Sequence, residues 1–339
     1  MHGDHVTVEF NRAEQMGAVL EASRAPSVRN IQPARWRFTD DGSVILFRAL
    51  NRTVPIADPT NHDLQASLGA AFEGLAIALS TRGLSMGTPE PEREAVATGC
   101  EPVVRAAIGR LDDPDPDPMA EWVKRRRSYR GVFPTADPAD IRRLVALERS
   151  DARLVLGTDR LAGLAVMHDA AAWTFESQPA HHAESWKWTR LERSDPRYKR
   201  DGLTADCLAF TGMKRFAAAQ ILPPGRFEMM AKLGLSQRLL SEAAKIRSAG
   251  AALVFCPRRA ETPFDVGRRM YRLWLEITAV GFHVAPMSAS ANDADTRAAL
   301  EEDCQVSADR RIANVFRVGR IADSAVAESP RLRVAELLV

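Results

Sequence analysis

The most constraining feature of this sequence is an acidic, proline-rich run at residues 112–118. These seven residues comprise four aspartates and three prolines. Proline lacks a backbone N–H and has a fixed φ, so such a run forms neither helix interior nor central strand. Proline-rich and self-repelling charged segments stay extended in water. We therefore predict a linker at 112–118 that joins a first part, residues 1–111, to a larger second part, residues 119–339.

Charge and composition exclude several classes of protein. The 46 Lys and Arg nearly balance the 44 Asp and Glu, leaving a net charge of +2, which argues against a surface built to hold nucleic acid. No apolar stretch is long enough to cross a bilayer. The segment Met1–Phe10 has no apolar core of a signal peptide. We expect a cytoplasmic protein with neither a nucleic-acid nor a membrane partner.

Cysteine and histidine spacing argues against a metal site. No CxxC pair and no HxxxH pair occurs, so the sequence predicts neither a zinc site nor a dithiol redox site. Reduced thiols in an intracellular protein are the expected state. The four cysteines are Cys100, Cys207, Cys256 and Cys304.

Hydrophobic patterning in the first part predicts helices and a hairpin. A helix is expected over Arg12–Arg24, and two β-prone runs around an Asp-Gly turn, Trp36–Thr39 and Val44–Arg48, read as a hairpin. Asp58 and Pro59 are typical of the start of a long helix. In that helix, residues 69–71 (Gly-Ala-Ala) are small enough for another backbone to approach closely.

The second part alternates in the same way. Helices are predicted from Asp137, over Asp159–Ser177, and from Thr262 to Gly281. Short strands are predicted as well. The expected fold class is α+β, with helices packed on a modest, mostly antiparallel sheet. The polar stretch 181–226 reads as a long loop with His181 and His182 at the surface. The predicted strands are Ala152–Gly157, Ala251–Cys256 and Ile312–Val318.

Several familiar motifs are missing. There is no GxGxxG after a strand, no GxxxxGK[ST] and no GxSxG, so a Rossmann dinucleotide site, a P-loop and an α/β-hydrolase lose their main support. No acid–base pair stands out either. The sequence therefore identifies no catalytic side chain and no metal ligand.

A polar loop between the first helix and the hairpin is one candidate site. Residues 25–38 contain Pro26, Ser27, Asn30, Gln32 and Pro33 directly before an aromatic strand. Neutral donors and acceptors of this kind read the polar edge of a planar ligand. An ordinary helix-to-strand connection, whose Ser and Asn stabilise turns, explains the same residues. Both interpretations remain open on the residues alone.

A basic cluster at residues 125–133 is the other candidate. Four arginines and Ser128 lie within six positions, and planar guanidinium groups bind phosphate oxygens in pairs. A solvated basic helix end explains such a cluster too, since cations offset the helix dipole. A nucleic-acid patch is the third interpretation, although interleaved aromatic residues are missing.

Three short motifs together resemble the FMN-dependent nitroreductase family. Pro26-Ser27-x-x-Asn30-x-Gln32-Pro33 is similar to its PSxxNxQPWxF loop, and residues 127–130 (Arg-Ser-Tyr-Arg) are similar to its RSxR phosphate motif. Arg331 and Arg333 resemble its final basic pair. Because the PSxxN loop precedes RSxR here, the order resembles the fused, double-length Acg-type branch.

The resemblance implies a nitroreductase-like fold in which the two parts form an intramolecular pseudo-dimer, compatible also with a homodimer. The first part would contact the flavin ring and ribityl chain, and the second would hold the phosphate. A backbone N–H at Gly281 or Phe282 would approach flavin N5. The first part has no RSxR of its own, so one FMN per chain is expected. The implied cofactor-binding residues are Pro26, Ser27, Asn30, Gln32, Arg127, Ser128, Arg130, Gly281, Phe282, Arg331 and Arg333.

Two departures from the family pattern lie in the loop. Trp36 stands two residues later than in the QPW motif, and Arg29 occupies the position usually held by His. Arg29 or Arg35 is therefore a hypothetical cation beside the ring, where it would favour a reduced, anionic flavin.

The activity that the resemblance implies is that of an FMN-dependent NAD(P)H oxidoreductase. Hydride would pass through FMN N5 to a small nitro or quinone-like acceptor, with NADH or NADPH as reductant. The alternative is a non-catalytic protein that binds or sequesters FMN beneath a lid at 181–226.

Overall fold

The computed structural model describes residues 10–111 and 115–339. Expectations about a leader in residues 1–9, and about Asp112 to Pro114 of the linker, lie outside the described residues. The chain divides into two compact units. We call them unit 1 (Met1–Lys124, Pro263–Leu275 and Arg331–Val339) and unit 2 (Arg125–Thr262 and Glu276–Pro330). This division differs from a simple split at the linker, because unit 1 also takes two later segments.

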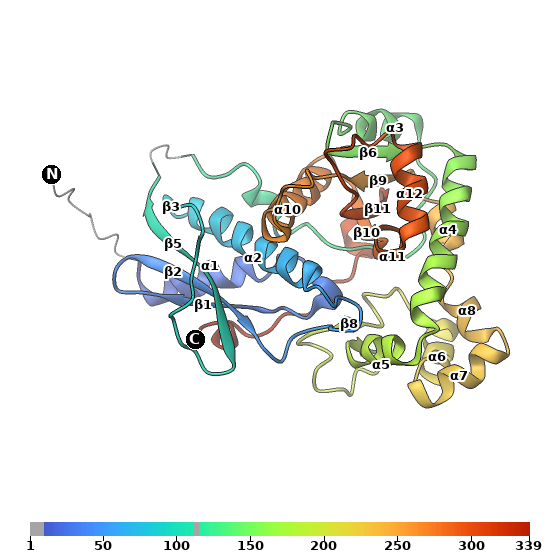
Figure 1. Cartoon of the computed structure of the whole chain (residues 1–339), viewed down its shortest axis with the longest axis horizontal. Helices are drawn as coiled ribbons and strands as arrows, with labels where there is room; N and C mark the ends of the chain where they lie inside the picture. Colours follow the sequence, from blue (N-terminus) through green and yellow to red (C-terminus); the bar gives the residue numbers. More distant parts are fainter. Residues whose placement is uncertain (1–9, 112–114) are drawn as a thin grey trace. The chain divides into compact units, whose positions relative to one another are not determined.

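Unit 1 contains an antiparallel sheet and long helices. Five strands of its described residues pair in the order β1-β2-β5-β3, with β4 also on β5. Helices α1 and α2 pack together, and α2 lies along the sheet (Figure 1). The predicted hairpin and both helices of this part are confirmed. The elements are α1 (Arg12–Ala22), η1 (Val28–Asn30), β1 (Ala34–Phe38), β2 (Ser43–Ala49), α2 (His62–Ser80), β3 (Leu84–Met86), β4 (Glu90–Pro91), β5 (Cys100–Arg110), η2 (Ala120–Trp122) and η4 (Val334–Glu336).

The end of the chain adds to the sheet of unit 1. Leu338 forms a parallel bridge with Trp36 of β1. The Trp36 amide donates to the Leu337 carbonyl at 2.8 Å, and the Val339 amide donates to the Trp36 carbonyl at 2.9 Å. These bonds hold the preceding residues, including Arg331, within unit 1.

Helix α2 begins at His62, four residues later than Asp58. The Asp58 carboxylate still accepts a hydrogen bond from the Leu64 amide at 2.8 Å, so it serves the first turn of the helix from outside it. The predicted close approach at Gly69 is confirmed. A Cβ there would overlap the Phe264 carbonyl of α10 (Pro263–Ala279), and one at Gly267 would overlap the Ala66 carbonyl.

The last part of the acidic run is anchored rather than fully solvated. Asp117 accepts from the Arg272 guanidinium at 2.6 Å, and its amide donates to Ser80 Oγ at 3.0 Å. Arg272 also pairs with the buried Glu73, at 2.5 Å. The sequence predicted an extended, solvated linker, but the ion pair with Arg272 holds Asp117 in place.

Unit 2 is built on a second antiparallel sheet, with the order β10-β11-β9-β6. The predicted α+β class with mostly antiparallel sheets is therefore confirmed, although β7 and β8 pair in parallel. The elements are α3 (Pro138–Val145), β6 (Ala152–Val155), α4 (Thr158–Glu176), α5 (Pro179–Lys187), β7 (Thr189–Arg190), β8 (Leu203–Thr204), α6 (Gly212–Ile221), α7 (Pro224–Lys232), α8 (Leu235–Leu240), α9 (Ala243–Arg247), β9 (Ala251–Phe255), β10 (His283–Pro286), α11 (Ser288–Asn292), α12 (Ala294–Asp303), β11 (Asn314–Gly319) and η3 (Asp323–Ala325).

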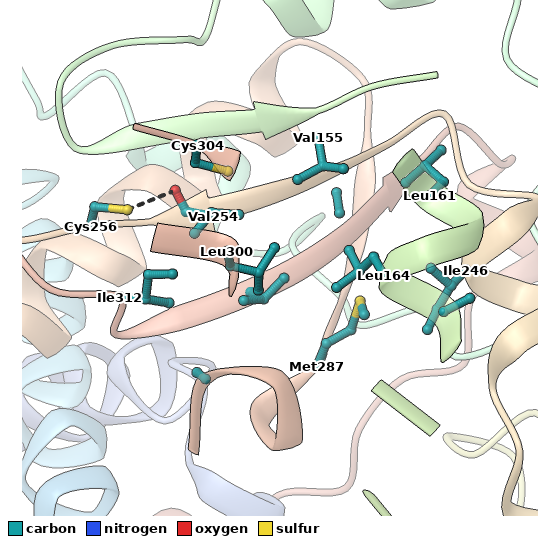
Figure 2. Close-up of a cluster of buried hydrophobic side chains, with 14 residues drawn as sticks. Val155, Leu161, Leu164, Ile246, Val254, Cys256, Met287, Leu300, Cys304 and Ile312 are labelled. Atoms are coloured by element: carbon teal, nitrogen blue, oxygen red, sulfur yellow. Dashed lines mark hydrogen bonds between the residues drawn. The ribbon is translucent and has the colours of Figure 1, made fainter. Parts of the chain in front are cut away.

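The main core of unit 2 packs helices on this sheet. Figure 2 shows Leu161 and Leu164 of α4 and Leu300 of α12 with Val254 of β9. Cys256 and Cys304 belong to the same apolar cluster. Burial raises the pKa of the Cys256 thiol to about 12 and that of the Cys304 thiol to about 11. Neither thiol is a reactive nucleophile at neutral pH, because the thiolate is the reactive form.

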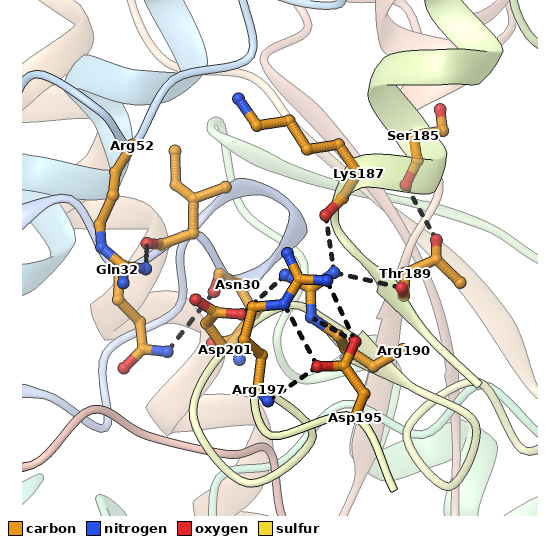
Figure 3. A network of polar contacts seen from close by, with 11 residues as sticks. Asn30, Gln32, Arg52, Ser185, Lys187, Thr189, Arg190, Asp195, Arg197 and Asp201 are labelled. Carbon is orange, nitrogen blue, oxygen red and sulfur yellow. Dashed lines mark hydrogen bonds and ion pairs between the residues drawn. The ribbon is translucent and has the colours of Figure 1, made fainter. Parts of the chain in front are cut away.

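The stretch 181–226 is folded, and the expectation of a long loop is wrong. It contains most of α5, the β7–β8 pair, α6 and the start of α7, and it supplies all but one of the buried residues of an apolar core. Arg190, 2 % exposed in its side chain, pairs with Asp201 at 2.8 Å (Figure 3). That core consists of Leu191, Ala205, Phe210, Ala218, Leu222 and Phe227.

The two adjacent histidines are buried, so their predicted surface position is wrong too. His182 stacks on the Phe227 ring at 3.5 Å between centroids, and its Nε2 lies 2.8 Å from the Leu222 carbonyl. The carboxylate of Glu176 lies within 3.5 Å of a ring nitrogen of both histidines. The apolar core beside α5 removes them from solvent, which a polar local sequence does not predict.

Candidate functional site

The loop between α1 and β1 has an unusual backbone. Arg29, Asn30 and Gln32 all have positive φ, at 45°, 55° and 51°. Residues other than glycine rarely adopt this region, and each such residue costs on the order of 1–3 kcal/mol unless its surroundings hold it. Ser27 Oγ accepts from the Gln32 amide at 3.0 Å, and Ser67 Oγ accepts from the Val28 amide at 3.0 Å. The loop is strained and fixed by hydroxyl groups.

Residues from the end of the chain complete this loop. Arg331 Nη1 donates to Asn30 Oδ1 at 2.7 Å, and Arg331 Nη2 donates to the Arg24 carbonyl at 3.1 Å. The Leu332 amide donates to Gln32 Oε1 at 2.8 Å. Asn30 and Gln32 are each 7 % exposed. Two of the predicted motifs, about 300 positions apart, thus meet within unit 1.

Two further arginines line the same loop. Arg52 donates to the Ile31 carbonyl at 2.8 Å, and Arg35 donates to the Gln32 and Ala34 carbonyls at 3.1 and 2.7 Å. Burial, helped by the positive charge of Arg52, lowers the pKa of Arg35 to about 10. Figure 3 shows Arg52 beside Asn30 and Gln32. Arg35 was considered from sequence as a cation near the ring; here its guanidinium binds backbone carbonyls of its own loop.

Pro26 of the loop motif and Arg333 of the final basic pair make fewer contacts with the loop than Asn30, Gln32 and Arg331 do. Pro26 is half-buried at the start of the loop. The Arg333 side chain is 80 % exposed, and its Nε lies 3.5 Å from Glu336 on the next turn. The two arginines of the predicted pair therefore differ: Arg331 is built into the loop, whereas Arg333 faces solvent.

The RSxR segment lies in unit 2, beside the edge of β10. Ser128 bridges Val284 in parallel, and the Tyr129 amide donates to the Val284 carbonyl at 2.9 Å. Arg127 donates to the Val326 carbonyl and to Glu328, each at 3.1 Å. Arg127 Nε is buried and has no hydrogen-bond partner among residues 10–111 and 115–339. Arg130 is half-buried, and burial lowers its pKa.

Gly281 and Phe282 form the C-terminal cap of α10. Gly281 has φ 90°, and its amide donates to the Thr278 carbonyl at 2.9 Å. The Phe282 amide donates to the Ile277 carbonyl at 3.1 Å. Because these bonds satisfy the last carbonyls of the helix, both N–H groups are engaged within unit 2. The local glycine stop was evident from sequence, but this engagement of the amides was not.

The described part of the chain has neither a metal-binding cluster nor a helix suited to span a membrane. Residues 10–111 and 115–339 hold no group of three or more His, Cys, Asp or Glu side chains that would bind a metal ion. None of the helices in these ranges has the length and apolar character needed to span a membrane.

No protein-family model matches the chain. Two uncharacterized proteins from different strains of Mycobacterium tuberculosis, MT3212 and Rv3127, are each 29 % identical to it over 188 residues. The match covers 51 % of this chain and 52 % of either relative. The chain thus spans about half the length of the curated relatives it matches.

Solved nitroreductase structures resemble this one at low identity. A candidate nitroreductase from Anabaena variabilis ATCC 29413 has a TM-score of 0.42 and 10 % identity, covering 93 % of this chain and 90 % of its own. The FMN-dependent nitroreductase NfnB of Mycobacterium smegmatis, in complex with NADPH, has a TM-score of 0.35 and 19 % identity, covering 64 % and 96 %. A Bacteroides fragilis nitroreductase with bound FMN has a TM-score of 0.36 and 15 % identity, covering 64 % and 95 %. All three TM-scores lie below 0.5, and the family of this chain remains a proposal.

Proposed function

We propose that this chain is a nitroreductase-like flavoprotein, an FMN-dependent NAD(P)H oxidoreductase that reduces a small nitro or quinone-like acceptor. The observation that carries the proposal is the Arg331–Asn30 contact in unit 1. It joins the PSxxN loop to the final basic pair, two motifs that were selected separately from the sequence. An ordinary connecting loop would need neither this long-range cation nor three residues with positive φ.

The residues around the loop fit an anionic, planar cofactor. Arg35, Arg52 and Arg331 give the loop a positive potential, while Ser27, Asn30 and Gln32 are neutral polar residues held in place by hydrogen bonds. Guanidinium groups bind phosphates and carbonyl-rich edges with planar, charge-assisted hydrogen bonds. When bound, FMN would supply the hydride chemistry, and the protein would supply binding and orientation. Chemistry that is carried by the cofactor requires no catalytic side chain, and the sequence analysis identified none.

The roles of the chain's own residues follow from their contacts. Ser27 holds the backbone turn by accepting the Gln32 amide, and Arg331 holds the Asn30 side chain in one orientation. A site whose groups are already ordered loses little entropy on binding. Arg35 and Arg52 would stabilise negative charge on a ligand beside the loop by Coulomb attraction.

The first test is the absorbance of the purified full-length chain before and after reconstitution with FMN. The proposal expects flavin bands and about one FMN released per chain on denaturation. The loop assignment expects Arg331→Gln to weaken FMN binding by about ten- to a hundredfold, the loss of one or two charge-assisted hydrogen bonds. Arg48→Gln is the matched control, because Arg48 is another arginine of unit 1 held by a neighbouring side chain, that of Glu101 on the strand β5. Protein that binds no FMN would overturn the proposal.

The second candidate function is that of a flavin store, a non-catalytic protein that binds or sequesters FMN. A reduction experiment distinguishes this store from a reductase. Anaerobic mixing of FMN-loaded protein with NADH or NADPH should bleach the flavin within seconds if the chain is a reductase. Addition of a quinone or nitroaromatic should restore the colour. The store remains a candidate because residues 181–226 are packed around an apolar core. A packed lid opens more slowly than a loose loop would. A flavin that stays oxidised for minutes with both nucleotides would favour the store.

A further inference from the structure

Helices α6, α7 and α8 of unit 2 expose a group of large apolar side chains. The three helices pack against one another (Figure 1). A single exposed apolar residue is ordinary on a protein surface, whereas a group of them marks a surface that contacts something apolar. The exposed fractions are 80 % for Met213, 64 % for Phe216, 53 % for Met229, 66 % for Leu233 and 40 % for Leu235.

Helical spacing sorts these residues into two apolar pairs. Met213 and Phe216 are three positions apart on α6, and Met229 and Leu233 are four positions apart at the end of α7. Residues three or four apart lie on the same face of a helix, so the members of each pair are neighbours. The buried side of the same helices is already occupied by a core that includes Phe227. The two apolar pairs therefore face away from that core.

Positive charge is concentrated in the same segment. Residues 212–238 contain five cations and one acid, a net charge of +4, whereas the whole chain has a net charge of +2. The rest of the chain is thus at −2. Arg215 and Arg226 donate to the uncharged oxygens of Leu191 and Gln220, so these contacts leave their charge unbalanced. The five cations are Lys214, Arg215, Arg226, Lys232 and Arg238.

Two of these cations lie directly beside exposed apolar residues. Lys232 immediately precedes Leu233, and Arg238 lies three positions after Leu235 on α8. Both cations are exposed, and neither forms an ion pair with residues 10–111 or 115–339. The surface of α6 to α8 thus combines protruding apolar groups with unpaired positive charge.

This combination selects among the possible occupants of the surface. A two-fold contact with a second copy of the chain would place the same positive patch on both sides, and like charges repel. A folded protein partner would need pockets that match side chains exposed by half or more of their area. An anionic lipid surface needs no such match, because its headgroups attract cations and its acyl boundary accepts apolar side chains in any arrangement.

We propose that α6, α7 and α8 bind this protein to an anionic lipid surface. The two apolar pairs enter the boundary between headgroups and acyl chains, and Lys232 and Arg238 lie beside the anionic headgroups. Binding of this kind needs no helix that spans the bilayer, in agreement with the lack of such a helix among the described residues. It revises the expectation of no membrane partner, which was based on the length of apolar stretches alone. The proposal is independent of flavin binding.

The test is flotation of the full-length chain with lipid vesicles. Vesicles of phosphatidylcholine with about one third phosphatidylserine should bind the chain, and pure phosphatidylcholine should bind it roughly tenfold less well. Added salt should weaken the binding, because it screens the attraction between the cations and the headgroups. Lys232→Gln should weaken binding about fivefold, the effect of one cation near the surface. Phe216→Ser should weaken it about tenfold, since it removes an inserting apolar group.

Matched controls come from other helices of unit 2. Arg142→Gln removes an exposed cation of α3, and Val166→Ser removes an apolar side chain of α4 that is 66 % exposed. Each should change vesicle binding less than about twofold, as a surface residue outside the contact does. The four substituted side chains are all exposed, so none of the variants removes a buried contact.

Several outcomes would overturn the proposal. Failure to float with the anionic vesicles, or equal losses in all four variants, would show that α6 to α8 do not bind lipid. A dimer that is lost in Phe216→Ser would assign the surface to a second copy instead. Binding to polyglutamate but not to vesicles would assign it to an acidic protein partner. Flavin content should be the same in all variants, so vesicle binding by a chain without FMN would contradict the proposed function alone.

Discussion

Arg331 Nη1 donates a 2.7 Å hydrogen bond to Asn30 Oδ1, across 301 positions of sequence. The same guanidinium reaches the Arg24 carbonyl at 3.1 Å. One side chain thereby ties the end of the chain to the start and the middle of the α1–β1 loop. The strained backbone of that loop is therefore held by Arg331, a residue that reaches it only once the end of the chain has folded against unit 1.

Removal of Arg331 should therefore destabilise the protein, whether or not a cofactor binds. Hydrogen bonds to charged groups contribute about 1.5–3 kcal/mol, so Arg331→Ala should lower the free energy of unfolding by about that amount. Arg333→Ala should change it by less than about 0.5 kcal/mol, because an 80 % exposed ion pair contributes little. Urea unfolding followed by circular dichroism measures both. Equal losses in the two variants would show that the Arg331 contacts are not special.

The positive φ of Arg29 predicts that glycine at this position stabilises the apo protein. The left-handed region costs a non-glycine residue about 1–2 kcal/mol, and glycine avoids most of that cost. Arg29→Gly should thus be about 1 kcal/mol more stable than Arg29→Ala, which removes the same side chain but keeps the strain. Thermal unfolding of the two variants gives the comparison. An alanine variant at least as stable as the glycine variant would mean that the backbone is not strained here.

Local patterns predicted the helices α1, α2, α3, α4 and α10 and the strands β1, β2, β6, β9 and β11, because the signals of these elements lie within a few residues. They did not predict β5, which lies between β2 and β3, or the shorter helices α5 to α9, α11 and α12. The repeat of Leu64, Leu68 and Leu75 indicates α2, and the apolar run at Ala251–Phe255 indicates β9; both elements are present. The short strand β10 was missed, since His283 and Pro286 are poor strand signals. Its position depends on pairing with β11, which local sequence does not encode.

The candidate site was predictable only in part for the same reason. The motifs identified Asn30, Gln32 and Arg331 as candidates. They did not predict that the side-chain amide oxygens of Asn30 and Gln32 accept hydrogen bonds from Arg331 and from the Leu332 amide. Arg317 was not selected as a site residue and Glu242 was not singled out, because an ion pair between residues far apart in sequence has no local pattern. An isolated arginine within an apolar strand, here Arg317 in β11, is the one signal that would have pointed to it.

The contact between α2 and α10 predicts strong intolerance of a single methyl group at Gly69. A Cβ there meets the Phe264 backbone carbonyl, which cannot move as a flexible side chain does. Gly69→Ala should cost about 1–3 kcal/mol or more, as overpacking does. Gly163→Ala in α4 is the matched control: its Cβ meets nothing within 4 Å, so the better helix propensity of alanine should stabilise by about 0.5–1 kcal/mol. Opposite signs in urea unfolding are expected, and like signs would contradict the close helix contact.

The environment of Glu242 predicts a specific acid sensitivity. Burial alone would raise the pKa of this carboxyl, but Lys245 and Arg317 outweigh burial and lower its pKa to about 2. A carboxyl with a depressed folded-state pKa stabilises the protein fully above its unfolded value, near 4.5, and that stabilisation is lost as the pH falls towards 2. The expected contribution at pH 7 is about 3 kcal/mol. Glu242→Gln should therefore be much less stable than the parent at pH 7, and the gap should narrow between pH 5 and pH 3.

Glu228→Gln is the matched control for this measurement, since Glu228 is an exposed carboxylate on α7. Its variant should follow the parent at every pH, because the Glu228 side chain is exposed to solvent in the folded chain, where a single surface charge contributes little. Urea unfolding at pH 7, 5 and 3 gives the three curves. A gap between the parent and Glu242→Gln that stays constant over this range would mean that the Glu242 carboxylate is not held ionised by Lys245 and Arg317. Lys245 and Arg317 would then face a neutral carboxyl rather than the anion that their contacts indicate.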